Sequence, residues 1–274
     1  MLAHALVAAT ESDGGAPARW MYFLHGILGT GNNLRTIAKS FVARRPQWGA
    51  VLVDLRLHGQ SRDVTPPDDL ASCARDLVEL EAAIPGPVRG VFGHSFGGKV
   101  ALEYLRVQPA IELSFIVDST PGARPDARGS EATVSIVRLL ESLPKRLDTR
   151  DEFVSLIMAA GHSRDIAMWL ALNVRPLKEG GYSFVLDVPR IAAMLDRYFM
   201  TDAWDVVESG RARIEMIVGG RSTVLDSGDR ARAMRIAAES RGRVAVHVIP
   251  DAGHWVHVDA PAELVDLVVG ATPP

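Results

Sequence analysis

Short, nearly continuous apolar runs recur along the chain and alternate with stretches whose apolar residues have helical spacing. The runs with the character of strands are residues 20–24, 50–55, 88–92, 113–118, 214–218 and 244–249. Runs of this kind are typical of strands buried on both faces of a parallel sheet. Their alternation with helices predicts a doubly wound, mostly parallel α/β sheet.

Helices are predicted between the early strands. Residues 34–45 have apolar positions at helical spacing after two asparagines, and residues 68–84 have them after Pro66 and Pro67. A Pro-Gly pair ends the second stretch. We expect both helices to pack against the sheet as scaffold.

The alternation stops between the strand that ends at Asp118 and the strand that begins near Ile214. Several amphipathic helical patterns fill this interval, and no pattern there predicts a strand of the sheet. We therefore interpret residues 119–205 as a helical cap. It is inserted into a core formed by residues 1–118 and 206–274.

The cap supplies candidate substrate-binding residues. Trp169, Tyr198 and Phe199 are large apolar side chains that would line a pocket between the cap and the core. The same spacing is also typical of side chains that only pack cap helices together, so both interpretations stay open.

Composition and charge restrict the partners. The chain has 274 residues, of which 47% are hydrophobic and 23% charged, and its formal net charge is −3. A chain of this length buries a large core. No run of like charge offers an electrostatic footprint for nucleic acid or an anionic membrane, and no apolar run reaches the roughly 18 residues of a membrane span. We expect a monomer or a homodimer that binds a small molecule.

The single Cys73 excludes an internal disulfide and fits a reducing compartment. The first residues include LAHALVAA, which contains His4 and has no basic residues before it, unlike a signal peptide. We therefore expect a cytoplasmic protein.

The motif Gly-His-Ser-Phe-Gly-Gly at residues 93–98 follows a predicted strand and precedes a predicted helix. This is the G-x-S-x-G pattern in the context that a nucleophile requires, because a very tight turn exposes the Ser95 hydroxyl at the edge of the sheet. The N–H of Phe96, at the start of the helix, would stabilise an oxyanion. A glycine-rich turn with an incidental serine is the alternative.

A second Gly-rich segment, FLHGILGTGNN at residues 23–33, also follows a strand. Its His-Gly turn would present the N–H of Ile27 to the nucleophile as the second oxyanion donor, with His25 in a structural role. The glycine spacing does not fit a phosphate loop, and no Lys-Ser or Lys-Thr follows.

The candidate base is His254, in the segment IPDAGHWVHVDAP after the last strand. It stands last in the order Ser, acid, His that is usual in hydrolases with a G-x-S-x-G turn between a strand and a helix. His257, His58 and His162 are the alternatives. His254, His257 and Asp251 lack a further ligand at metal spacing, so we expect no metal and no cofactor.

Three side chains compete to be the acid that orients the histidine. Ser222 follows the strand 214–218 at the usual position of the acid, but a hydroxyl carries no charge. Asp226 precedes a helical run and is typical of a helix N-cap. Asp118 ends the strand after that of Ser95, and parallel strands end at one edge. We favour Asp118 and keep Asp226 as the alternative.

Several segments together resemble the α/β-hydrolase superfamily, namely LHGILGTGNNL, VDLRLHGQS, GHSFGGKVAL, VDSTP, LNVRPLKEGGYSFVLDV and DAGHWVHVDAP. They are most similar to esterases of the abhydrolase-domain-eleven type and their small bacterial relatives. The resemblance runs from about Tyr22 to Val269. It implies an α/β-hydrolase fold whose acid is Asp118, with Ser222 as an auxiliary fourth member.

The expected activity is that of a serine hydrolase. It would cleave carboxylic esters or thioesters of small to medium acyl groups through an acyl-enzyme. One alternative is a lyase of the same fold, in which Arg124, Arg175, Arg190 and Arg197 would bind an acidic substrate. The other is a ligand-binding receptor with little or no turnover.

Overall fold

The computed structural model describes residues 1–9 and 16–274, and its centre is a seven-stranded sheet in the order β1-β3-β2-β4-β5-β8-β9. β1 is antiparallel to β3, and all other neighbours are parallel. The strands are β1 (His4–Val7), β2 (Arg19–Leu24), β3 (Trp48–Val53), β4 (Val88–His94), β5 (Leu113–Val117), β8 (Arg213–Gly219) and β9 (Val244–Ile249). The mostly parallel α/β sheet predicted from the apolar runs is confirmed.

The strand β1 is an element that the sequence pattern does not predict. It comes from the LAHALVAA segment, and its residues pair from His4 with Val53 to Val7 with Ala50. An edge strand with only one buried residue, Val7, lacks the continuous apolar pattern of the central strands.

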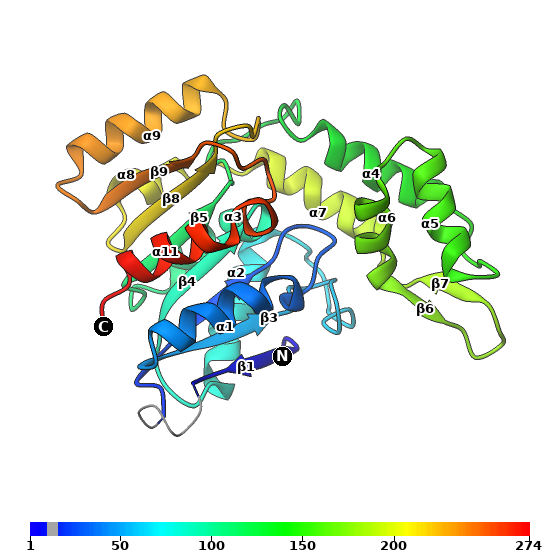
Figure 1. The fold of residues 1–274 in the computed structure, drawn as a ribbon, viewed down its shortest axis with the longest axis horizontal. Coiled ribbons are helices and arrows are strands. Elements are labelled where there is room, and N and C mark those ends of the chain that lie inside the picture. Colours follow the sequence, from blue (N-terminus) through cyan, green and yellow to red (C-terminus); the bar gives the residue numbers. More distant parts are fainter. Residues whose placement is uncertain (10–15) are drawn as a thin grey trace.

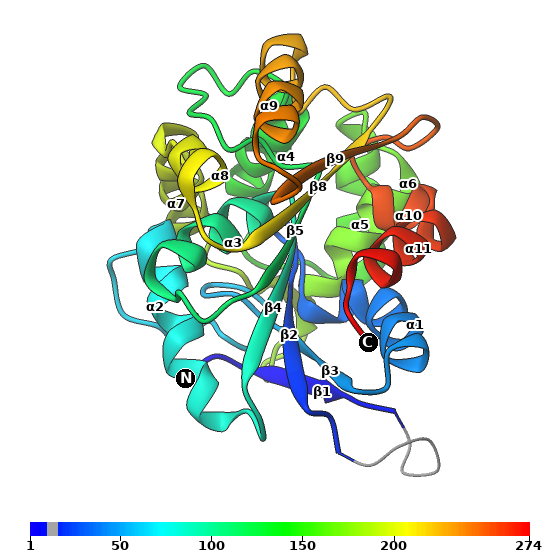
Figure 2. The same ribbon diagram turned by 90° about the vertical axis from the view of Figure 1, so that its left-hand side faces the viewer.

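Helices cover both faces of the sheet, as Figure 2 shows. On one face lie α1 (Arg35–Arg44) and α11 (Pro261–Ala271), and just before α11 the short α10 (Val256–Asp259) buries Val256 in the same apolar cluster. The other face carries α2 (Leu70–Leu80), α3 (Phe96–Val107), α8 (Trp204–Ser209) and α9 (Ser227–Glu239). The two faces bury separate apolar clusters, so the sheet is sandwiched as a doubly wound fold requires.

Between β5 and α8 the chain forms the cap, which extends to one side of the core in Figure 1. Its elements are α4 (Glu131–Ser142), α5 (Arg150–Ala159), α6 (Arg164–Leu170), the 3-10 helix η4 (Ala171–Asn173), β6 (Val174–Pro176), β7 (Tyr182–Phe184) and α7 (Val188–Met200). The hairpin β6-β7 is not predicted from the sequence, because strands of three residues are too short to show alternation. In the described ranges, no helix combines the length and apolarity needed to cross a bilayer.

Candidate active site

Ser95 lies in the sharp turn between β4 and α3. Its φ of 54° and ψ of −119° are costly for a residue with a side chain. A Cβ on Gly93 would stand 2.2 Å from the Gly97 carbonyl oxygen, and one on Gly97 would stand 2.5 Å from that of Leu24. Only glycine fits at these two positions, so the G-x-S-x-G pattern is a requirement of the turn.

Asp118 follows β5 directly, and its side chain is completely buried. One carboxylate oxygen, Oδ2, accepts from His254 Nδ1 at 2.7 Å and from Ser222 Oγ at 2.5 Å. The other, Oδ1, accepts from the Gly219 N–H at 3.0 Å. Since Nδ1 of His254 donates to a carboxylate, its Nε2 is left as the acceptor that a general base needs.

His254 lies in the loop after β9, residues 250–255, here called the histidine loop. Its side chain is 30% exposed. The carbonyl of His254 accepts from His94 Nε2 at 2.8 Å, and the two imidazole rings have centroids 5.0 Å apart. His94 is the residue before Ser95, so this bond ties the turn that contains Ser95 to the histidine loop. No role for His94 was predicted from the sequence, although its place beside Ser95 was the available signal.

The alternative acid, Asp226, is the N-cap of α9 and lies away from His254. Its Oδ1 accepts from the Asp229 N–H at 2.8 Å, and Oδ2 forms ion pairs with Arg124 at 3.2 Å and Arg128 at 3.4 Å. These hydrogen bonds and arginines hold the pKa of Asp226 below its usual range. The structure therefore brings Asp118, not Asp226, to the imidazole.

The other histidines considered as bases take different positions. His58 is buried, and burial lowers its pKa to about 3. His257 lines the cavity with its ring 4.6 Å from that of His94, and burial lowers its pKa to about 4. His162 lies between α5 and α6. Within residues 1–9 and 16–274, no three His, Cys, Asp or Glu side chains come together as a metal site.

The expected oxyanion donors are the N–H groups of Phe96 and Ile27. Phe96 is the first residue of α3, so its N–H has no acceptor within the helix. Ile27 belongs to the segment 25–29, here called the oxyanion loop. Across the described part of the chain, no carbonyl or side chain accepts from its N–H. Both donors are thus available at the edge where Ser95 lies.

Ser95 and His254 open into one cavity of about 480 Å³. The oxyanion loop, α1, α4, α6 and the histidine loop all contribute to its wall. The apolar side chains of the wall include Leu28, Ile37, Ile136, Ile166, Trp169 and Trp255. None of the described residues that line it is Asp, Glu, Lys or Arg.

Of the three expected substrate-binding residues, only Trp169 lines this cavity, where its ring lies 5.0 Å from that of Trp255. Tyr198 and Phe199 are not among the described lining residues, which corrects the expectation. Tyr198 instead packs on Phe96 at 5.6 Å between ring centroids. Both side chains are buried because α7 turns this face toward the core, and α4 and α6 cover the cavity.

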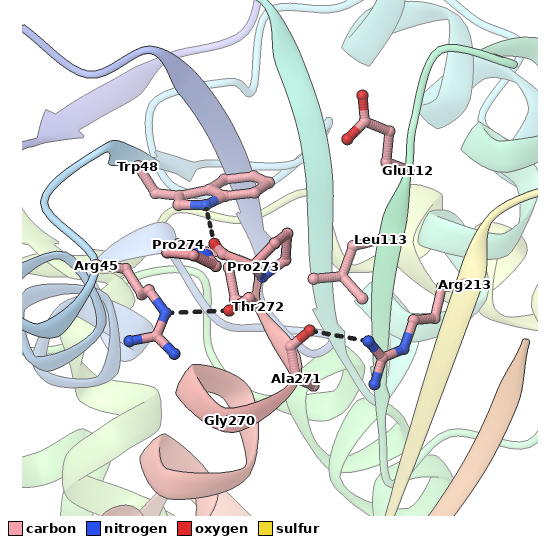
Figure 3. Close-up of a pocket in the computed structure, with 10 residues that line it drawn as sticks. All are labelled: Arg45, Trp48, Glu112, Leu113, Arg213, Gly270, Ala271, Thr272, Pro273 and Pro274. Atoms are coloured by element: carbon pink, nitrogen blue, oxygen red, sulfur yellow. Dashed lines mark hydrogen bonds between the residues drawn. The ribbon is translucent and has the colours of Figure 1, made fainter. Parts of the chain in front are cut away.

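A second cavity, of about 330 Å³, lies at the amino-terminal edge of the sheet and is drawn in Figure 3. Its donors already have partners: Arg45 Nε donates to the Thr272 carbonyl at 3.0 Å, and Trp48 Nε1 to the Pro273 carbonyl at 3.0 Å. Because Trp48 opens β3, this cavity is at the edge opposite Ser95 and contains none of the expected catalytic groups.

A mostly parallel sheet, a tight Gly-x-Ser-x-Gly turn between a central strand and a helix, and a helical insertion after β5 define the α/β-hydrolase class. The chain belongs to the alpha/beta hydrolase family, whose model matches residues 21–267. The resemblance found in the sequence is therefore confirmed.

Curated relatives cover most of the chain. The chain is 28% identical to the sn-1-specific diacylglycerol lipase ABHD11 of Mus musculus over 264 residues, which are 93% of this chain and 81% of that protein. It is 29% identical to the esterase Rv0045c of Mycobacterium tuberculosis over 280 residues, 96% of this chain and 85% of that protein. A solved marine microorganism esterase superposes with a TM-score of 0.82 over 99% of both chains; at 21% identity, this likeness shows the fold alone.

Proposed function

We propose that the protein is a serine hydrolase of carboxylic esters or thioesters that acts through an acyl-enzyme. The proposal rests on the contact of His254 Nδ1 with the buried Asp118 carboxylate, because His254 lines the same cavity as Ser95. Relatives named as an esterase and a diacylglycerol lipase support the same reaction class.

In the proposed mechanism, His254 Nε2 takes the proton of the Ser95 hydroxyl while Oγ attacks the substrate carbonyl. The N–H groups of Ile27 and Phe96 stabilise the oxyanion, and Asp118 stabilises the imidazolium. The tetrahedral intermediate expels the alcohol or thiol, which takes the proton from His254. Water then repeats the sequence on the acyl-enzyme and releases the acid.

The cavity favours an uncharged, mainly apolar substrate. Its described wall contains aliphatic and indole side chains, four histidines and no Asp, Glu, Lys or Arg. A charged group would lose its hydration there without gaining an ionic partner. A volume of about 480 Å³ suits a small to medium acyl group. We therefore expect neutral esters or thioesters to be the preferred substrates.

The lyase alternative requires arginines that face an acidic substrate, and the cap arginines have other partners. Arg190 pairs with Asp68 at 2.7 Å, and Arg124 pairs with the buried Asp229. Arg197 contacts Asp69, and Arg175 donates to backbone carbonyls of its own segment. None of the four is among the described residues that line the cavity. This arrangement favours the hydrolase over the lyase.

A panel of chromogenic p-nitrophenyl esters and matched thioesters of increasing acyl length tests the proposal. We expect turnover of the neutral compounds, loss of activity in Ser95→Ala, and weak activity on esters that carry a carboxylate in the acyl chain. Recovery of every ester unchanged, together with a raised melting temperature in its presence, would instead identify a receptor.

A further inference from the structure

Leu28 in the oxyanion loop has a left-handed backbone conformation, with φ of 63°. This conformation is strained for a residue with a bulky side chain, so neighbouring contacts must hold it. The Leu28 N–H donates to His58 Nε2 at 2.9 Å, and the Leu28 carbonyl accepts from Asn173 Nδ2 at 3.0 Å. The two bonds fix the peptide units on either side of Leu28, and both are buried.

Hydrogen bonds also hold the preceding peptide unit, which carries the Ile27 N–H. Its carbonyl, that of Gly26, accepts from His25 Nδ1 at 2.7 Å and from the Gly29 N–H at 3.1 Å. His25 Nε2 in turn accepts from the Leu55 N–H at 3.1 Å. Three successive peptide units are therefore fixed, the first two by histidines of the core and the third by the cap.

Asn173 is the cap residue that holds the oxyanion loop by a hydrogen bond. It ends η4 in the Asn-Val-Arg-Pro motif, and only 3% of its surface is exposed. Its own carbonyl accepts from the Val185 N–H at 3.0 Å, which ties it to the segment after β7. η4 follows directly on α6, which contributes Trp169 to the cavity wall. The cavity wall and the oxyanion loop are thus connected through one short segment of the cap.

We propose that Asn173 is a positioning residue for the oxyanion hole, through which the cap sets the direction of the Ile27 N–H; this rests on the proposed acyl transfer at Ser95. Without the Asn173 amide, the Leu28 carbonyl is buried with one partner fewer, and the strained peptide rotates to find another. An oxyanion donor is effective only when it is aimed at the oxygen of the transition state. Misdirection of the Ile27 N–H slows the chemical step more than it weakens substrate binding.

The test compares Asn173→Leu, which keeps the size but has no donor, and Asn173→Ala with the control Arg150→Met. Arg150 Nε donates to the Ala171 carbonyl at 3.1 Å, so the control perturbs η4 without removing the bond to Leu28. We expect kcat to fall between about 10- and 100-fold in the Asn173 variants, with KM within about three-fold of wild type. Arg150→Met should keep the wild-type kcat.

A trifluoromethyl ketone separates positioning from a merely structural role, because its adduct with Ser95 places an oxyanion in the hole. Its affinity should fall by the same factor as kcat/KM, while the corresponding alcohol, which forms no adduct, should bind all forms equally. Wild-type kcat and ketone affinity in both Asn173 variants would overturn the proposal.

If the variants do not fold, amide hydrogen exchange of the wild-type protein with and without the ketone tests the proposal. Binding of the ketone should slow amide exchange in residues 26–30 and 171–175 together. Protection limited to the first segment overturns the role of Asn173. A wild-type protein that neither hydrolyses esters nor binds the ketone overturns the proposed function as well, whereas active wild type with unaffected variants overturns the positioning role alone.

Discussion

Asp118 stands one residue beyond β5, with its backbone in a left-handed conformation at φ 44°. Aspartate tolerates this conformation better than most residues. The turn directs the carboxylate toward donors from the end of β8 and from the histidine loop. The sequence indicated Asp118 because parallel strands end at one edge, but the bond from the Gly219 N–H depends on strand pairing that no local pattern reveals.

Asp118→Asn should reduce kcat by about four orders of magnitude, because a neutral amide neither stabilises the imidazolium nor fixes the productive tautomer. Asp226→Asn should keep kcat near wild type and change stability by no more than about 1 kcal/mol, since asparagine is also a good N-cap. Steady-state kinetics and urea unfolding of both variants measure these effects. A large loss in Asp226→Asn with an active Asp118→Asn would reverse the assignment.

Ser222→Ala should have a smaller effect, with kcat reduced about ten-fold. The carboxylate of Asp118 loses the donor at 2.5 Å but keeps its bonds to His254 and Gly219. Ser61→Ala is the matched control, because it also removes a buried hydroxyl and is remote from Asp118 in the hydrogen-bond network. Equal kcat in the two variants would remove Ser222 from the catalytic group.

Among the helices, α3, which follows Ser95, is linked by Lys99 to both ends of the cap. Its buried ammonium donates to the carbonyls of Gly122 at 2.9 Å, Tyr198 at 3.0 Å and Thr201 at 3.0 Å. The nitrogen also lies 4.2 Å from the centroid of the Tyr198 ring. The sequence marked Lys99 only as part of a motif, because its partners are distant in the chain.

Lys99→Met should therefore lower the free energy of unfolding by about 3 kcal/mol, because three buried carbonyls lose a charged donor. Urea unfolding measures the loss, and Lys39→Met on the exposed face of α1 is the control with the same change in side chain. Equal stability of the two variants would show that Lys99 does not anchor the cap.

Helical periodicity predicted the cap helices well but not which face of each meets the cavity. α7 buries Tyr198 and Phe199 toward the core, whereas α4 and α6 supply Ile136 and Ile166 to the wall. Both kinds of contact require the same apolar spacing along a helix. The choice between them depends on how the cap docks, which is a long-range property.

In the whole molecule, the interior strands β2, β3, β4, β5 and β8 could be predicted because burial on both faces leaves a continuous apolar run. β9 lies at an edge and is mostly half-buried, but its residues are still apolar enough to predict a strand. The edge strand β1 and the hairpin β6-β7 could not, since each is short and partly exposed. The site follows from the sheet: β4, β5, β8 and β9 are adjacent, so the residues after their ends converge.

Stability should decrease as the pH falls from 6.5 to 4. Burial lowers the pKa of His25 and His257 to about 4, that of His58 to about 3, and that of His94 well below its ordinary value of 6.5. In this window the unfolded chain binds more protons than the folded protein, so protonation favours unfolding. Each of these histidines lowers the free energy of unfolding by up to about 2 kcal/mol between pH 7 and pH 5.

Urea unfolding at pH 7 and pH 5 measures this dependence. His58→Gln should reduce the loss in the free energy of unfolding between pH 7 and pH 5 by the contribution of one group, because glutamine does not titrate. A free energy of unfolding that stays constant over the two pH values would contradict the burial of neutral histidines.

Acyl transfer through Ser95 is tested most directly by mass spectrometry of the protein quenched in acid during turnover of a p-nitrophenyl ester. We expect a mass increase equal to one acyl group, located by peptide mapping on Ser95, and no increase in Ser95→Ala. Product release without any acyl adduct, or an adduct on another residue, would contradict acyl transfer through Ser95.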